Sequence, residues 1–238
     1  MKIAKQFFML ALAAPAFLIA RAQTADEIIN KHFDAIGGKD KISQIKSIYS
    51  ESSVQVMGND APSTLTILNG KGYRLESDFN GQKMIQVYTD KGGWAVNPMA
   101  GGTDPQAMPD DQYKQGKDQI DVGGPLLDYS SKGNKVEMLG KDEAGYKVKV
   151  TNKDGIATTY WIDPNTYYIT KASFTGSMMG QEMEVTRNYS NYQKTDYGYT
   201  MPFTIEINYG GQFSVTSNVK KVQVNKDVDP KIFDMTAK

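Results

Sequence analysis

The chain has 238 residues, with 27 basic and 27 acidic side chains, one histidine and no cysteine. Without cysteine it has no disulfide bonds, thiolate nucleophiles or cysteine-bound metals, so an exported form must be held together by its core alone. The balanced charge argues against nucleic-acid binding, which requires a basic surface.

Residues 1–22 follow the plan of a secretory signal peptide. Lys2 and Lys5 precede a mostly apolar run from Phe7 to Ala20, and Ala20-Arg21-Ala22 supplies small residues where a signal peptidase cleaves. We therefore expect the chain to be exported to the periplasm.

The apolar run is short for a membrane span and contains Pro15, so a retained membrane anchor is the weaker alternative. We expect the mature chain to begin near Gln23 and to form one domain over 23–238. Without a cysteine at the cleavage point, it is expected to be soluble and not lipid-anchored through its own Cys. Its 216 residues carry 24 basic and 27 acidic side chains, which also argues against general adhesion to anionic lipid.

The start of the mature chain predicts a helix. Thr24 and Glu27 have the spacing of a capping box, and Gly37-Gly38 supplies a stop. Apolar or weakly polar residues recur between them at helical spacing: Ile28, Ile29, His32, Phe33 and Ile36. A short second helix is expected over 41–45.

From residue 47 onward the hydrophobic period changes to two, which predicts strands. Asn-Gly, Asp-Gly and Asp-Pro-Asn turns separate them, so consecutive strands should pair as antiparallel neighbours. The expected strands are 47–57, 63–69, 72–79, 82–89, 93–97, 135–140, 144–151, 156–163, 166–175, 181–192, 199–209 and 212–224.

One segment, 97–133, interrupts this meander. It is rich in Gly, Pro and Asp, and short helices are expected near 109–118 and 124–131. Long excursions of this kind often form covers or functional loops.

Alternation assigns one apolar and one polar face to the sheet. In 144–150, for example, Tyr146, Val148 and Val150 oppose Lys147 and Lys149. About a dozen strands in one sheet must curl. The fold class is therefore mainly β (α+β): a wide, incomplete antiparallel β-barrel or half-barrel, with the N-terminal helix and the short helices covering its concave face.

The apolar side of this curved sheet predicts a hydrophobic cavity for a ligand. Its expected lining residues, some of them plain core, are Leu65, Ile67, Leu75, Met84, Trp94, Val148, Trp161, Phe174, Met183 and Ile205.

Four stretches, in order, resemble a known family. KMIQVYTDKGGWAVNP at 83–98 resembles the strand–turn–strand signature of the LolA/LolB-like periplasmic lipoprotein carriers, and ILNGKGYRLES at 67–77 is similar to the preceding hairpin. YWIDPNTYYITKASF at 160–174 is similar to a later hairpin of that family, and DVDPKIFDM at 227–235 to its C-terminal turn.

This resemblance implies an incomplete antiparallel barrel that holds lipid acyl chains under helices at its mouth. In the well-studied carrier, an arginine before the second hairpin turn helps to hold the lid. Asn69 stands at the matching place here, with Arg74 nearby. The resemblance therefore does not assign an opening mechanism to this chain.

Sequence signals for catalysis are sparse, and we expect no enzyme, cofactor or metal. The single histidine, His32, lies on the apolar stripe of the first helix, where a packing role is expected. Asp110, Asp111, Asp118 and Asp121 lack the spacing of a calcium loop. A pair of catalytic carboxylates, as in glycosidases, stays open as a third reading.

The hairpin at 160–174 carries aromatic rings on both faces, unlike its neighbours. We expect it to be covered on both sides or to lie at the rim, with Trp161 and Phe174 directed toward the cavity.

Two functions follow from the sequence. The first is a periplasmic carrier, expected to be a monomer, that binds a lipid or an acylated lipoprotein. The alternative is an interaction or sensor module of the cell envelope that binds a protein partner without carrying lipid.

Overall fold

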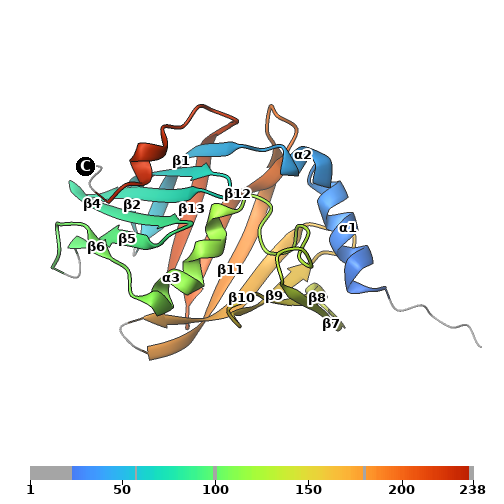
Figure 1. Cartoon of the computed structure of the whole chain (residues 1–238). Coiled ribbons are helices and arrows are strands. Elements are labelled where there is room, and N and C mark those ends of the chain that lie inside the picture. The colour runs from blue at the N-terminus through green and yellow to red at the C-terminus, as the bar shows by residue number, and fades with distance from the viewer. Residues whose placement is uncertain (1–22, 57, 99–100, 179–180, 236–238) are drawn as a thin grey trace, which may run out of the picture.

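The computed structural model describes residues 23–56, 58–98, 101–178 and 181–235, so the expected signal peptide lies outside the described residues. Thirteen strands form one antiparallel sheet in the order β6-β5-β4-β3-β2-β1-β13-β12-β11-β10-β9-β8-β7 (Figure 1). The strands are β1 Ser47–Val56, β2 Asn59–Leu68, β3 Gly72–Phe79, β4 Gln82–Thr89, β5 Gly93–Val96, β6 Gln106–Ala107, β7 Lys135–Asp142, β8 Gly145–Thr151, β9 Ala157–Ile162, β10 Ile169–Met178, β11 Gln181–Lys194, β12 Thr200–Tyr209 and β13 Phe213–Val224.

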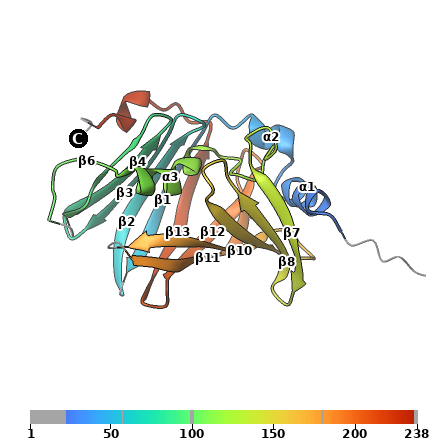
Figure 2. The ribbon, with the colours of Figure 1, turned by 60° about the horizontal axis from the view of Figure 1, so that its bottom comes forward.

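The sheet is curved but not closed. Among the described strands, β6 and β7 each pair on one side only, and β1 pairs with β13 to join the two halves of the meander. Figure 2 shows the sheet bent into a trough around α3. The half-barrel expected from the alternating pattern is therefore confirmed.

Helix α1, Ala25–Ala35, begins at the predicted capping box. The Glu27 backbone N–H donates to Thr24 Oγ1 at 3.2 Å, and the Thr24 backbone N–H donates to Glu27 Oε2 at 3.3 Å. Gly37 and Gly38 follow with φ of 125° and 93°, which favours glycine and ends the helix. The short helix α2, Lys39–Ser43, then leads into β1.

The buried face of α1 packs on one end of the concave side, against β8 and β9. Ile28, Ile29 and Phe33 form a core cluster there with Val148, Val150, Ile162, Leu126 and Leu127. The helix therefore covers one end of the trough, whereas its middle is crossed by residues 110–134 (Figure 1).

We call residues 110–134 the cover segment. It contains α3, Asp110–Gly116, and the 3-10 helix η2, Lys117–Ile120. The expected second helix over 124–131 does not form. Gly124 and Asp128 adopt φ of 62° and 47°, and the stretch is a series of turns instead.

A second core cluster lies on the convex face. Ile85, Val87, Trp94 and Val96 pack there beneath Phe233 of the C-terminal 3-10 helix η3, Pro230–Phe233. The expectation of one apolar face and one wet face is therefore wrong at β4 and β5, because the C-terminal segment covers the convex side of these strands.

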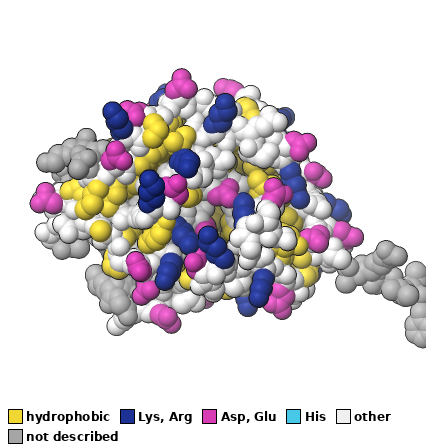
Figure 3. All heavy atoms as spheres, in the orientation of Figure 1, with side chains coloured by type: hydrophobic (Ala, Val, Ile, Leu, Met, Phe, Trp, Pro, Cys, Tyr) yellow, Lys and Arg dark blue, Asp and Glu magenta, His cyan; other side chains and the backbone are white. Residues whose placement is uncertain are grey.

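Charged side chains are interspersed over the face seen in Figure 3, and neither sign covers a large area of it. This distribution agrees with the balanced composition and provides no broad basic surface on that face.

Candidate functional site: the trough and its cover segment

Strand pairing determines which side chains face the trough. The concave residues of β11 are Met183, Val185, Arg187 and Tyr189, and cross-strand partners carry this face across the sheet. On the C-terminal side of the sheet, the concave side chains are Thr158 and Tyr160 of β9, Ala172 and Phe174 of β10, and Ile205, Ile207 and Tyr209 of β12. On the N-terminal side, they are Leu65 and Ile67 of β2, Tyr73 and Leu75 of β3, and Met84 and Tyr88 of β4.

Most of the expected lining residues share this concave face. They are Leu65, Ile67, Leu75, Met84, Val148, Phe174, Met183 and Ile205. Val148 is fully buried beneath α1 and belongs to the core cluster there, so it offers no free surface. The other seven lie along the trough.

Trp94 lies on the opposite, convex face. Its indole Nε1 donates to the carbonyl oxygen of Phe233 at 2.8 Å, and the Arg74 guanidinium lies 5.4 Å from its ring centre. The expectation that Trp94 lines the cavity is wrong, because β5 presents Ala95 and Gly93 to the trough instead.

Trp161 also lies on the convex face, where it pairs with Lys171. The ammonium groups of Lys147 and Lys171 lie 5.5 and 4.6 Å from its ring centre, and its Nε1 donates to Asp142 at 3.1 Å. Both faces of this hairpin carry rings, as expected, but the trough side is occupied by Tyr160 and Phe174.

A cavity of ≈190 Å³ lies between the cover segment and β8–β11. Phe174 is the only expected lining residue that borders it. Its sheet side also includes Val150, Thr158, Tyr160, Ala172, Arg187 and Tyr189, and its cover side includes Gln115, Asp118, Gln119, Asp121, Gly124 and Pro125.

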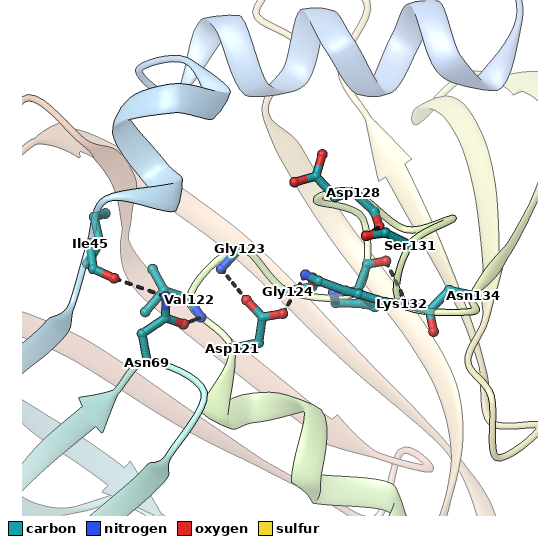
Figure 4. Close-up of polar contacts among 11 residues, drawn as sticks. Ile45, Asn69, Asp121, Val122, Gly123, Gly124, Asp128, Ser131, Lys132 and Asn134 are labelled. Carbon is teal, nitrogen blue, oxygen red and sulfur yellow. Dashed lines mark hydrogen bonds and ion pairs between the residues drawn. The ribbon is translucent and has the colours of Figure 1, made fainter. Parts of the chain in front are cut away.

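The cover segment is fastened to the sheet at two opposite turns. On one side, Asn69 Oδ1 accepts from the Val122 backbone N–H at 3.0 Å, while its Nδ2 donates to the Ile45 carbonyl at 3.0 Å (Figure 4). The Gly70 N–H donates to the Ile120 carbonyl at 2.8 Å. Asn69 thus holds the cover through its amide.

On the other side, the turn between β8 and β9 binds the cover. Asn152 Nδ2 donates to Asp118 Oδ2 at 2.7 Å, and Lys117 forms an ion pair with Asp154. Arg74, in contrast, is directed to the convex face, where it pairs with Glu76 and donates to the Ile232 carbonyl. It makes none of the contacts that hold the cover.

Contacts inside the cover segment fix its turns. Lys132 pairs with Asp121 and donates to the Gly124 carbonyl at 2.8 Å, and Asn134 Nδ2 donates to the Pro125 carbonyl at 2.9 Å (Figure 4).

A Cβ at Gly116 would lie 2.0 Å from the Tyr88 ring, so only glycine lets α3 end this close to the trough.

The residue that sequence reasoning missed is Arg187. It borders the cavity and its guanidinium lies 5.1 Å from the Phe174 ring centre. The signal was present in the sequence, since Arg187 is the one charged residue at the apolar positions of 183–189.

His32 is a packing residue of α1. It is 5% exposed, and its Nδ1 donates to the Tyr167 carbonyl at 2.8 Å. Burial lowers its pKa to about 4, against the opposing effect of this hydrogen bond. Within the described residues, no group of His, Cys, Asp or Glu side chains is arranged to hold a metal ion.

His32 is expected to make the folded state less stable as pH falls from about 6.5 to 4. Over that window the unfolded chain binds a proton that the buried imidazole does not, so the folded state loses about 3 kcal/mol in total. Urea unfolding at pH 7 and pH 4.5 measures this loss. In His32→Gln the difference between the two pH values should shrink by about 2 kcal/mol; an unchanged difference contradicts the assignment.

In the part of the chain that the structure describes, no helix is long and apolar enough to cross a membrane. No model of a known protein family matches the sequence. No curated protein matches it either.

Two solved structures share the architecture. A putative outer membrane lipoprotein-sorting protein domain from Vibrio parahaemolyticus superposes with a TM-score of 0.58 at 13% identity, covering 89% of this chain and 97% of that chain. A LolA superfamily protein from Nitrosomonas europaea superposes with a TM-score of 0.59 at 14% identity, covering 90% and 98%. The chain has the LolA fold.

The LolA fold expected from the four sequence stretches is thereby confirmed over about nine tenths of the chain. At these identities the similarity establishes the LolA fold alone, so function must be argued from the trough itself.

Proposed function

We propose that the chain is a carrier of the cell envelope that holds an acyl chain or another apolar ligand in the trough. The observation that supports it is a set of half-buried apolar side chains on the concave face that belong to neither core cluster. They are Leu65, Ile67, Leu75, Met84, Ile205, Ile207 and Val215.

The energy for such binding comes from burying the ligand's hydrocarbon. Each methylene contributes ~0.8 kcal/mol, so ten would supply roughly 8 kcal/mol before the costs of association. This kind of site needs no catalytic residue or metal. The LolA fold and the signal-like residues 1–22 add support for a carrier that acts outside the cytoplasm.

Entry of a long chain requires the cover segment to move. The cavity of ≈190 Å³ is smaller than the roughly 300–1,000 Å³ usual for ligand pockets. The contacts that hold residues 110–122 of the cover at Asn69 and at the β8–β9 turn are polar, so water can replace them when this part opens, while Leu126 and Leu127 stay in the core cluster.

The small cavity also favours a second candidate, a protein-interaction module whose trough stays filled by its own side chains. Native mass spectrometry of the chain purified from periplasm, followed by lipid extraction, separates the two. A co-purifying acyl species supports the carrier. Failure to bind any fatty acid or lipopeptide, with a fluorescent apolar probe also excluded, contradicts it.

A matched pair of substitutions tests whether the trough is the binding surface. Leu65→Asn places an amide on the concave face and is expected to weaken binding of the apolar probe by about 10-fold, because the amide must be desolvated. Thr64→Asn places the same side chain on the convex face and should leave probe affinity unchanged. Fluorescence titration measures both, and equal affinities in the two variants contradict the proposed site.

A further inference from the structure

Arg187 stands in the middle of an apolar strand face. On β11 its concave neighbours are Val185 and Tyr189, and across the sheet it pairs with Ala172 and Ile207. Ala172 has no side chain beyond Cβ, so space remains over the guanidinium. That space is part of the cavity beneath the cover segment.

Among the described residues, the Arg187 guanidinium has no ion-pair partner. Its Nε is buried with no hydrogen-bond partner among the described residues, and no described carboxylate forms an ion pair with it. The residues that the structure does not describe include no Asp or Glu in the sequence, so they hold no side-chain carboxylate either.

On the sheet side of the cavity, aromatic residues lie around Arg187. Tyr73, Tyr160, Tyr189 and Tyr209 are its electrostatic neighbours, and the ring of Phe174 lies against it. Burial raises the pKa of Tyr73 to about 12 and also raises that of Tyr160, so these phenols stay uncharged at pH 7. Removing an unpaired cation from water in such surroundings costs free energy, and an anion that enters the cavity would offset that cost.

We propose that Arg187 binds the carboxylate of an amphiphilic ligand whose hydrocarbon tail lies along the trough. This rests on the proposed carrier function and names its ligand class. The guanidinium offers a planar, two-pronged match to a carboxylate. The concave face continues from Arg187 across the sheet through Ile207, Val215 and Val56. These apolar side chains are half-buried and suit the hydrocarbon tail.

The charges on the cover side favour a carboxylate over a phosphate. Asp118 and Asp121 border the same cavity, held by Asn152 and Lys132 respectively. Two nearby carboxylates repel a dianionic phosphate monoester more than a single negative charge. A fatty acid therefore fits this site better than an alkyl phosphate.

The test compares three ten-carbon probes on the purified chain by displacement of a fluorescent apolar dye. Decanoate is expected to bind more tightly than decanol or decyl phosphate. Arg187→Met, which keeps an unbranched side chain but is shorter and uncharged, should weaken decanoate binding by at least about 30-fold and leave decanol unchanged. The decanoate affinity of Arg187→Lys should lie between that of the original chain and that of Arg187→Met.

Arg74→Met is the matched control, since Arg74 lies on the convex face. It should leave decanoate affinity unchanged. Arg187→Met should unfold at the same temperature as the original chain or higher, because it removes a partly buried charge that has no ion-pair partner among the described residues.

The outcomes separate this inference from the function on which it rests. If no probe binds, the carrier proposal itself fails. If decanoate and decanol bind equally and Arg187→Met changes neither, the carrier stands and the role of Arg187 is overturned. If decyl phosphate binds more tightly than decanoate, the assignment to a carboxylate is overturned.

Discussion

Uptake of an apolar probe is expected to fall at least about 10-fold when residue 117 of the cover segment is tethered to residue 154 of the β8–β9 turn. In the native chain Lys117 and Asp154 form an ion pair across this boundary. Lys117→Cys with Asp154→Cys, joined by a reducible thiol cross-linker, holds the cover where it borders the small cavity. The chain has no native cysteine to interfere. Stopped-flow fluorescence measures the uptake rate before and after cross-linking.

The control for the tether uses the same residue types in a pair that joins two turns of the sheet and includes no residue of the cover segment. Lys71 and Asp90 form an ion pair at 3.2 Å between two turns of the sheet. Lys71→Cys with Asp90→Cys, cross-linked in the same way, should take up probe at the original rate, and reduction of the 117–154 tether should restore uptake. Normal uptake with the tether intact would show that the ligand does not enter beneath the cover.

Phe33→Ala is expected to lower the free energy of unfolding by about 3–5 kcal/mol. Phe33 is 2% exposed and packs at the centre of the cluster between α1 and the end of the trough. The substitution leaves a cavity that the sheet cannot close, because β8 and β9 are fixed by their own pairing. Urea unfolding followed by tryptophan fluorescence measures the change.

Asp34→Ala serves as the comparison for Phe33→Ala, because Asp34 follows it on the same helix but is exposed. Its effect should stay within about 0.5 kcal/mol. Similar stabilities for the two variants would mean that α1 does not contribute its buried face to the core. Such a result would also mean that α1 does not cover one end of the trough.

Short-range sequence patterns were sufficient to predict most of the helices and strands. The capping box at Thr24 and Glu27 predicted the start of α1, because both partners lie within one turn. Turn residues separated the strands, and their antiparallel order followed because short turns leave no other pairing. The cover segment was predicted as an excursion, but its turns depend on contacts such as Lys132 with Asp121, which composition does not specify.

Side-chain direction was harder to predict, since it depends on partners distant in the sequence. Trp94 faces the convex side because Phe233, more than a hundred residues later, covers it there. On β10 a bulge between Ile169 and Lys171 changes which residues face inward, so simple alternation fails across it. The prediction for Trp161 failed because either face of its hairpin could have been the inner one. Arg187 was overlooked because apolar residues alone were used to define the lining.

The pairing of β1 with β13 has a consequence for how the chain reaches its final form. Ile48 lies opposite Val224, so the centre of the sheet joins residues from the two ends of the described chain. Contacts of such long sequence separation form slowly. β13 is the last strand to be synthesised, yet it fills the place between β1 and β12. A chain lacking β13 would expose two long strand edges, which favours aggregation. Assembly of this protein therefore depends on its final strand.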